Sequence, residues 1–164
     1  LYVLNNALGG SMSSRLFQHI REERGMAYSV YSYPSGYSGT GYFALYAGTE
    51  GKQGAKVAEL MLQEARRMRE QGLTADEFHR AKEQLKGSYM LGQESTSARS
   101  SAIGRSMLMR GYALEEGEML SRIAGVRMED VEGILPYVLD ETRMVAAVVG
   151  RQAVHEPIRQ ALNM

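Results

Sequence analysis

The 164-residue chain contains no cysteine, no tryptophan and only three histidines. Without cysteine there are no disulfides, no thiolate metal ligands and no cysteine nucleophile. Lysine plus arginine equal aspartate plus glutamate at 19 each and form no basic block, so the sequence does not predict nucleic-acid binding. No apolar run approaches the roughly 20 residues that a bilayer-spanning helix needs.

The chain also lacks the common catalytic motifs. His19 begins the run H-I-R-E-E, which matches neither H-E-x-x-H nor H-x-x-E-H, and His79 and His155 have no partner at metal-ligand spacing. Neither a G-x-S-x-G elbow nor a P-loop occurs. Glu22 and Glu23 are neighbours on a predicted helix and point to different sides of it, unlike a paired-carboxylate site. We therefore expect no metal site, no cofactor and no complete catalytic site within residues 1–164.

The length fits one domain with a substantial hydrophobic core, so residues 1–164 are predicted to form a single domain. The chain opens on the apolar run Leu1–Leu4 without an initiator methionine. We expect a piece of a longer protein, in which a first strand and its lead-in, and any targeting signal, lie upstream.

A glycine pair and a serine-rich run precede the first amphipathic segment. Gly9-Gly10 allows a close backbone approach, and either Ser11 or Ser13 could cap a helix. Apolar residues at helical spacing predict a helix over about 11–24, and Gly25 is suited to end it.

Two strands are predicted next. Residues 1–7 read as the end of a strand or as an apolar helix, a strand is predicted at about 27–34, and turn residues follow to Gly39. A second strand is predicted over Thr40–Gly48. Its two faces are both apolar or aromatic, so we expect both to be covered, at least in part.

The rest of the chain is mainly helical. Gly72 closes one helix, Thr74 and Glu77 form a capping box for the next, and Ser95 caps a third. A late helix begins near Glu129, where Pro136 should kink or shorten it. Met144–Val149 is predicted to return to the sheet as a strand. Because the strands cluster, we predict an α+β fold, a two-layer sandwich with helices on one face of a mainly antiparallel sheet.

Arg21 and Tyr28 are the candidate site residues. An arginine near a helix end and a tyrosine on the following strand could converge on one carbonyl oxygen, stabilising an oxyanion or anchoring a peptide backbone. Arg15, Arg21 and Glu22 are expected on helix faces other than the packed one. The alternative for the two candidates is that Arg21 lies on a solvated face and Tyr28 fills a half-buried strand position. Side-chain chemistry alone favours this alternative.

Several segments resemble one family of peptidases. The run Leu8–Val30 resembles the second-half signature of the inverted-zincin peptidases, which include mitochondrial processing peptidase, pitrilysin and insulin-degrading enzyme. Gly41–Thr49 resembles the second strand of that half, and Gly72–Phe78 its capped helix. The resemblance extends to Gly150, although Arg127-Met128 stands where relatives often have a threonine cap.

The resemblance implies a division of labour between two α+β halves that enclose a chamber. The first half holds zinc through H-x-x-E-H and a distant glutamate, none of which this chain contains. The second half contributes an arginine and a tyrosine seven residues apart, positions that Arg21 and Tyr28 match. The implied role of Arg21 is to grip a substrate carbonyl, and that of Tyr28 is to donate its hydroxyl to the scissile carbonyl.

The expected parent is therefore a zinc metalloendopeptidase that degrades or processes peptides, with this chain inactive alone. Its expected partners are the zinc-bearing half or subunit and peptide substrates, in a homo- or heterodimer, through an exposed apolar face. We expect a soluble protein of the bacterial cytoplasm or periplasm. Two alternatives stay open: a non-catalytic scaffold or assembly subunit of the same fold, and an accessory subunit that completes the active site of a separate zinc-bearing chain.

Overall fold

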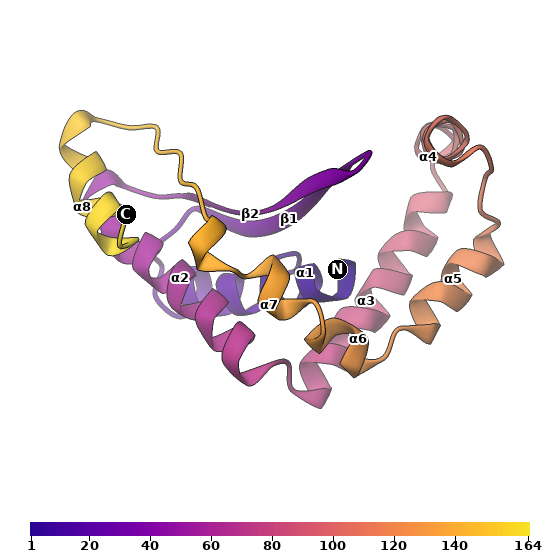
Figure 1. Cartoon of the computed structure of the whole chain (residues 1–164), viewed down its shortest axis with the longest axis horizontal. Coiled ribbons are helices and arrows are strands. Elements are labelled where there is room, and N and C mark those ends of the chain that lie inside the picture. Colours follow the sequence, from indigo (N-terminus) through magenta and orange to yellow (C-terminus); the bar gives the residue numbers. More distant parts are fainter.

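A two-stranded antiparallel hairpin lies over helices in the computed structural model, which describes residues 1–164 (Figure 1). Helices α1 and α2 lie beneath the hairpin, and α3 leads away from them to α4 and α5 (Figure 1). Clustered strands with helices on one face confirm the predicted α+β class. The elements are α1 Tyr2–Leu8, the π-helix η1 Phe17–Glu22, β1 Ser29–Tyr37, β2 Thr40–Gly48, η2 Gly51–Gln53, α2 Gly54–Gln71, α3 Ala75–Gln93, α4 Thr96–Arg110, α5 Glu116–Gly125, α6 Met128–Glu132, α7 Leu135–Val138, η3 Glu141–Arg143, η4 Gln152–Val154 and α8 His155–Ala161.

The hydrophobic core lies between the hairpin and the helices beneath it. Its most deeply buried large side chains come from α1, from η1 and the residue before it, from α2 and from α6: Leu4, Leu8, Leu16, Ile20, Val57, Met68 and Val131. The first residues therefore form an apolar helix, one of the two conformations expected for them. None of the helices combines the length and apolar composition that crossing a bilayer requires.

The predicted helix boundaries at Gly72, Thr74 and Ser95 are confirmed. Gly72 follows α2 with φ of +70°, a conformation that favours glycine. Thr74 and Glu77 form the capping box, because the Glu77 amide donates to Thr74 Oγ1 at 3.2 Å and the Thr74 amide donates to Glu77 Oε2 at 2.8 Å. Ser95 Oγ accepts from the Ala98 amide at 3.2 Å.

The late helix is broken as expected. It forms two short pieces, α6 and α7, and Pro136 lies in the first turn of α7, where its missing amide hydrogen costs nothing. Asp130, three residues after the N-cap Arg127, supplies the reciprocal bond of a capping box, since its Oδ2 accepts from the Arg127 amide at 2.8 Å.

The prediction of a regular helix over 11–24 was wrong at its start. Residues 11–14 form turns, and the helical conformation begins at Arg15. The serine hydroxyls donate to carbonyls instead of accepting as caps: Ser11 Oγ to Asn6 at 3.0 Å and Ser14 Oγ to Ser11 at 2.5 Å. Such local bonds offer the backbone an alternative to the helix.

The hairpin is longer than predicted. β1 continues through Pro34 to Tyr37, and the turn shrinks to Ser38 and Gly39, whose φ is +79°. Proline is tolerated there because β1 has a strand neighbour on one side only.

Only one face of the hairpin is covered, so the expectation of cover on both faces was wrong. Phe43, Leu45 and Ala47 pack against the core. Tyr42 and Tyr46 on the opposite face remain about half exposed. The reason is that every helix in contact with the hairpin lies on one side of it.

The predicted strand over Met144–Val149 does not form. This segment has no regular secondary structure, and the side chains of Val145 and Val149 are 90% and 102% exposed. An apolar β-rich run becomes a strand only beside another strand that pairs its amides and carbonyls. The sheet ends at β1 and β2 and offers it no such partner.

Gly9 provides the close approach between the α1 turn and β1. Its carbonyl accepts from the Ser32 amide at 3.1 Å. A β-carbon at position 9 would lie 2.5 Å from the Ser32 backbone nitrogen and 2.9 Å from Leu16 Cδ1. The glycine therefore sets how closely the segment that leads to η1 packs on the hairpin.

We expect Gly9→Ala to destabilise the fold by about 1–3 kcal/mol, because backbone and core must shift to relieve the overlap. Thermal unfolding measures this as a lower Tm. Gly104→Ala in α4 is the matched control, since a β-carbon there meets nothing within 4 Å. The control should raise stability slightly through helix propensity, and an equal loss in both variants would contradict the close-approach explanation.

Candidate active site

Arg21 lies in a π-helix, which the sequence did not predict. The π-helix η1 spans Phe17–Glu22, and the guanidinium of Arg21 lies over the Phe17 ring, 4.9 Å from its centre. π-Helical turns are rare and frequently occur at functional sites. The wider turn changes the direction of Arg21 relative to an α-helix, while Ile20 remains fully buried as the anchor.

A buried carboxylate holds η1 against α2. His19 Nδ1 lies 3.0 Å from Glu64 Oε1, and Arg67 Nη1 lies 3.2 Å from the same oxygen. The Glu64 side chain is only 6% exposed. These contacts position the π-helix, and with it Arg21, on the long helix beneath the hairpin.

The link between the two candidate residues is held at several points. The Gly25 amide donates to the Arg21 carbonyl at 3.0 Å, and the Met26 amide donates to Ile20 at 3.0 Å. Gly25 has φ of +58°, as predicted for the residue that ends this helix. Thr49 Oγ1, at the end of β2, donates to the Met26 carbonyl at 2.5 Å.

Tyr28 lies at the open end of the hairpin. Its amide donates to the Gly48 carbonyl at 2.9 Å, while its side chain is 87% exposed. It lines an open hollow of about 450 Å³. The other lining residues are Gly25, Met26, Ala27, Gly48, Thr49, Glu50 and Gln53.

Arg21 and Tyr28 do not meet within this chain. Both are exposed, no hydrogen bond joins them, and Arg21 is not among the residues that line the hollow. Together they offer one charged and one neutral hydrogen-bond donor. Each of the two side chains can therefore donate to a carbonyl oxygen.

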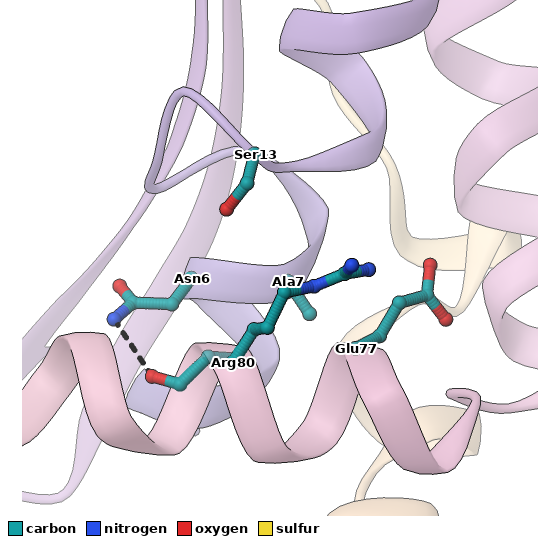
Figure 2. A pocket seen from close by; sticks show the side chains of 6 residues that line it. Asn6, Ala7, Ser13, Glu77 and Arg80 are labelled. Atoms are coloured by element: carbon teal, nitrogen blue, oxygen red, sulfur yellow. Dashed lines mark hydrogen bonds between the residues drawn. The ribbon is translucent and has the colours of Figure 1, made fainter.

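A second, much smaller cavity lies between α1 and α3 (Figure 2). Its volume of about 10 Å³ has room for about one water molecule. Asn6 and Arg80 lie on opposite sides of it, and Asn6 Nδ2 donates to the Ala81 carbonyl at 3.2 Å (Figure 2). The cavity belongs to the packing of two helices and is too small for an organic ligand.

The chain's own side chains do not form a zinc site. No three of its histidine, aspartate and glutamate side chains converge on a common point. His19 is engaged with Glu64, and His79 and His155 are exposed on different helices.

Arg15, expected on a helix face away from the packing, lies largely buried. Its Nε and Nη2 donate to the two carboxylate oxygens of Glu77 at 2.6 and 2.8 Å, and Nη2 also donates to the Gly72 carbonyl at 2.8 Å. These hydrogen bonds lower the pKa of Glu77 from its usual 4.5 to about 2. The pair ties the start of α3 to the segment that carries Arg21.

The supporting residues His19, Glu64 and Thr49 were missed by sequence reasoning. Glu64 lies within the apolar stripe of an amphipathic helix, and a buried carboxylate among buried aliphatic residues is the one signal available. Glu64 lies far from His19 in the sequence, and Thr49 lies far from Met26, so spacing alone could not pair these residues.

Comparison with known proteins places this chain in a family. The sequence pattern described as the peptidase M16 inactive domain matches residues 1–85. An uncharacterized zinc protease of Streptomyces coelicolor is 47% identical over 148 residues, which are 90% of this chain and 32% of that protein. The chain thus spans about a third of that relative's length.

Two solved structures share the fold. A peptidase M16 inactive domain from Pseudomonas fluorescens matches with a TM-score of 0.71 at 23% identity, over 85% of this chain and 33% of that one. A chain of complex III2 from Candida albicans matches with a TM-score of 0.69 at 20% identity, over 83% of this chain and 34% of that one. The match over residues 1–85 is decisive for the family: this chain belongs to the peptidase M16 inactive domains.

Proposed function

We propose that this chain is the substrate-binding, non-zinc half of a zinc metalloendopeptidase. The observation that carries the proposal is the exposure of Arg21 and Tyr28 at one well-held corner of a family member. A tyrosine that fills a half-buried strand position would not be exposed in this way, so the structure argues against that alternative for Tyr28. The zinc belongs to another half or subunit, because no ligand set exists here.

In this function the two side chains act as donors to a peptide. Arg21 grips a substrate carbonyl with its guanidinium, which the Phe17 ring holds in place. Tyr28 donates its hydroxyl to the scissile carbonyl as negative charge develops on the oxygen.

Helix α4 supports the presence of a partner half. It contains no buried residue, and Ile103, Met107, Leu108 and Met109 expose 46 to 88% of their surface. Such a group of exposed apolar side chains is typical of a surface that another protein covers. We propose that the zinc-bearing half, or a second subunit, docks here.

Removal of zinc from the complete protein tests the proposal. A mixture of unlabelled peptides should be cleaved by the complete protein, lose cleavage after chelation and regain it with added zinc. Mass spectrometry of the fragments gives the readout. Residues 1–164 alone should release no fragments, and adding them to a separate zinc-bearing chain should restore cleavage if the halves are two chains.

The fold shared with a complex III2 chain favours one other function, a non-catalytic scaffold or assembly subunit. That likeness concerns the fold, and fold alone does not determine function. A complete protein that binds no zinc, cleaves no peptide and stays in a larger assembly would support the scaffold and contradict the peptidase.

A further inference from the structure

The uncovered face of the hairpin is aromatic and carries no charged side chain. Neither β1 nor β2 contains aspartate, glutamate, lysine or arginine. The exposed fractions of its five tyrosines lie between 41 and 62%. These residues are Tyr31, Tyr33 and Tyr37 on β1 and Tyr42 and Tyr46 on β2, and together they are called the tyrosine track.

The rings of the track hold one another in place. Tyr31 and Tyr46 stand opposite each other in the ladder and stack with ring centres 4.8 Å apart. Tyr42 contacts Tyr33 edge-on at 6.1 Å and Tyr37 at 6.5 Å. The surface is therefore ordered before a ligand binds, so little side-chain conformational entropy is lost on binding.

The two faces of the hairpin differ in the kind of contact that they suit. The face toward the helices carries Val30, Leu45 and Phe43, which are typical of permanent packing. The track carries only tyrosines and small residues: Ala44 stands opposite Tyr33, and Ser35 opposite Tyr42. Because a phenol is apolar on its face and polar at its hydroxyl end, such a surface is stable in water and suits a ligand that binds reversibly.

The track leads to the candidate active site. Tyr28 pairs its amide with Gly48, and the Tyr31–Tyr46 rung follows about three residues, or roughly 10 Å, further along the strands. Tyr37 lies about 20 Å beyond Tyr31 at roughly 3.3 Å per residue. An extended peptide that has its scissile bond at Tyr28 and continues along the uncovered face would reach the track with the third to about the ninth residue from that bond.

We propose that the tyrosine track is a substrate-binding surface for extended, uncharged peptide segments with apolar or aromatic side chains. This inference rests on the proposed peptidase function and adds its substrate class. Charge argues against an acidic occupant, since the track offers no cation to pair with a glutamate, which would lose hydration without return. Continuity with Tyr28 supports a peptide that also enters the active site.

The test compares a long and a short peptide on the complete protein. The long peptide has about 20 residues with leucine or phenylalanine on both sides of the cleavage site, and the short one has about six, too few to pass the first rung. The double variant Tyr33→Thr/Tyr42→Thr should raise KM for the long peptide roughly ten- to hundred-fold at nearly unchanged kcat. The short peptide should be cleaved as by wild type. Tyr137→Thr, at an exposed tyrosine on α7, is the matched control.

A binding measurement separates this proposal from the peptidase function. Fluorescence anisotropy of the labelled long peptide should give a Kd that the double variant weakens and that Tyr28→Phe leaves nearly unchanged, whether or not the protein cleaves. If the double variant changes neither the KM nor the Kd of the long peptide, the proposal is overturned. A double variant with a lowered Tm and an unchanged Kd would also overturn it, because this result would mean that the rest of the protein covers the uncovered face of the hairpin. An equal loss with both peptides would also overturn it.

Discussion

Tyr28→Phe should lower kcat of the complete peptidase by about 10²–10³-fold, the range seen when one oxyanion donor is removed. KM should change little, because the hydroxyl is needed mainly in the transition state. The substitution removes one oxygen atom from a side chain that is 87% exposed and makes no hydrogen bond within this chain. Folding should therefore be unaffected, and steady-state peptide hydrolysis measures the effect directly.

Two comparisons sharpen this result. Tyr137→Phe removes the same hydroxyl from another exposed tyrosine and should leave kcat and KM as in wild type. Arg21→Ala should raise KM as well as lower kcat, because a guanidinium that grips a carbonyl also binds the ground state. Full turnover by Tyr28→Phe would remove Tyr28 from the mechanism.

Glu77→Gln should destabilise the fold by about 3 kcal/mol, near the low end for breaking a buried ion pair. The Arg15 and Glu77 side chains are 11% and 18% exposed and form two parallel hydrogen bonds. Arg15 Nη1 is already buried without a partner, so loss of the carboxylate charge leaves the guanidinium largely uncompensated. Chemical denaturation measures the loss.

Arg15→Met combined with Glu77→Gln provides the control for this effect. The double variant should recover part of the stability that Glu77→Gln loses, since an unpaired buried charge no longer remains. A double variant whose loss equals the sum of the two single losses would contradict a coupled pair.

The same pair predicts a pH dependence. The pKa of Glu77 is lower in the folded chain, at about 2, than its ordinary value of 4.5. Its contribution to stability is therefore fully present above about pH 4.5 and disappears as the pH falls toward 2. Glu77→Gln should flatten the stability curve in this window, and an unchanged acid dependence would contradict the assignment.

Local signals in the sequence predicted most of the helical boundaries. Gly72, the capping box of Thr74 and Glu77, and Gly25 each act through contacts within a few residues, so their effect is readable from spacing. The prediction of a strand over Met144–Val149 was wrong for the opposite reason. A strand depends on a neighbour that local sequence does not contain.

The candidate site was less predictable than the fold. Side-chain chemistry alone favoured a structural interpretation of Arg21 and Tyr28, and only family resemblance selected them. The π-helix has no sequence signal comparable to a cap, and Arg15 meets Glu77 across 62 residues of chain. The tyrosine alternation was visible in the strands, but its exposure depends on which side of the hairpin the helices occupy.

A structure of the complete protein bound to a non-cleavable peptide analogue tests the central claim most directly. The account predicts that the Tyr28 hydroxyl lies about 2.7–3.1 Å from the oxygen that replaces the scissile carbonyl. Arg21 should donate to a carbonyl of the same peptide at hydrogen-bond distance. A peptide bound elsewhere, with Arg21 and Tyr28 both facing solvent or packed against a scaffold partner, would contradict the account.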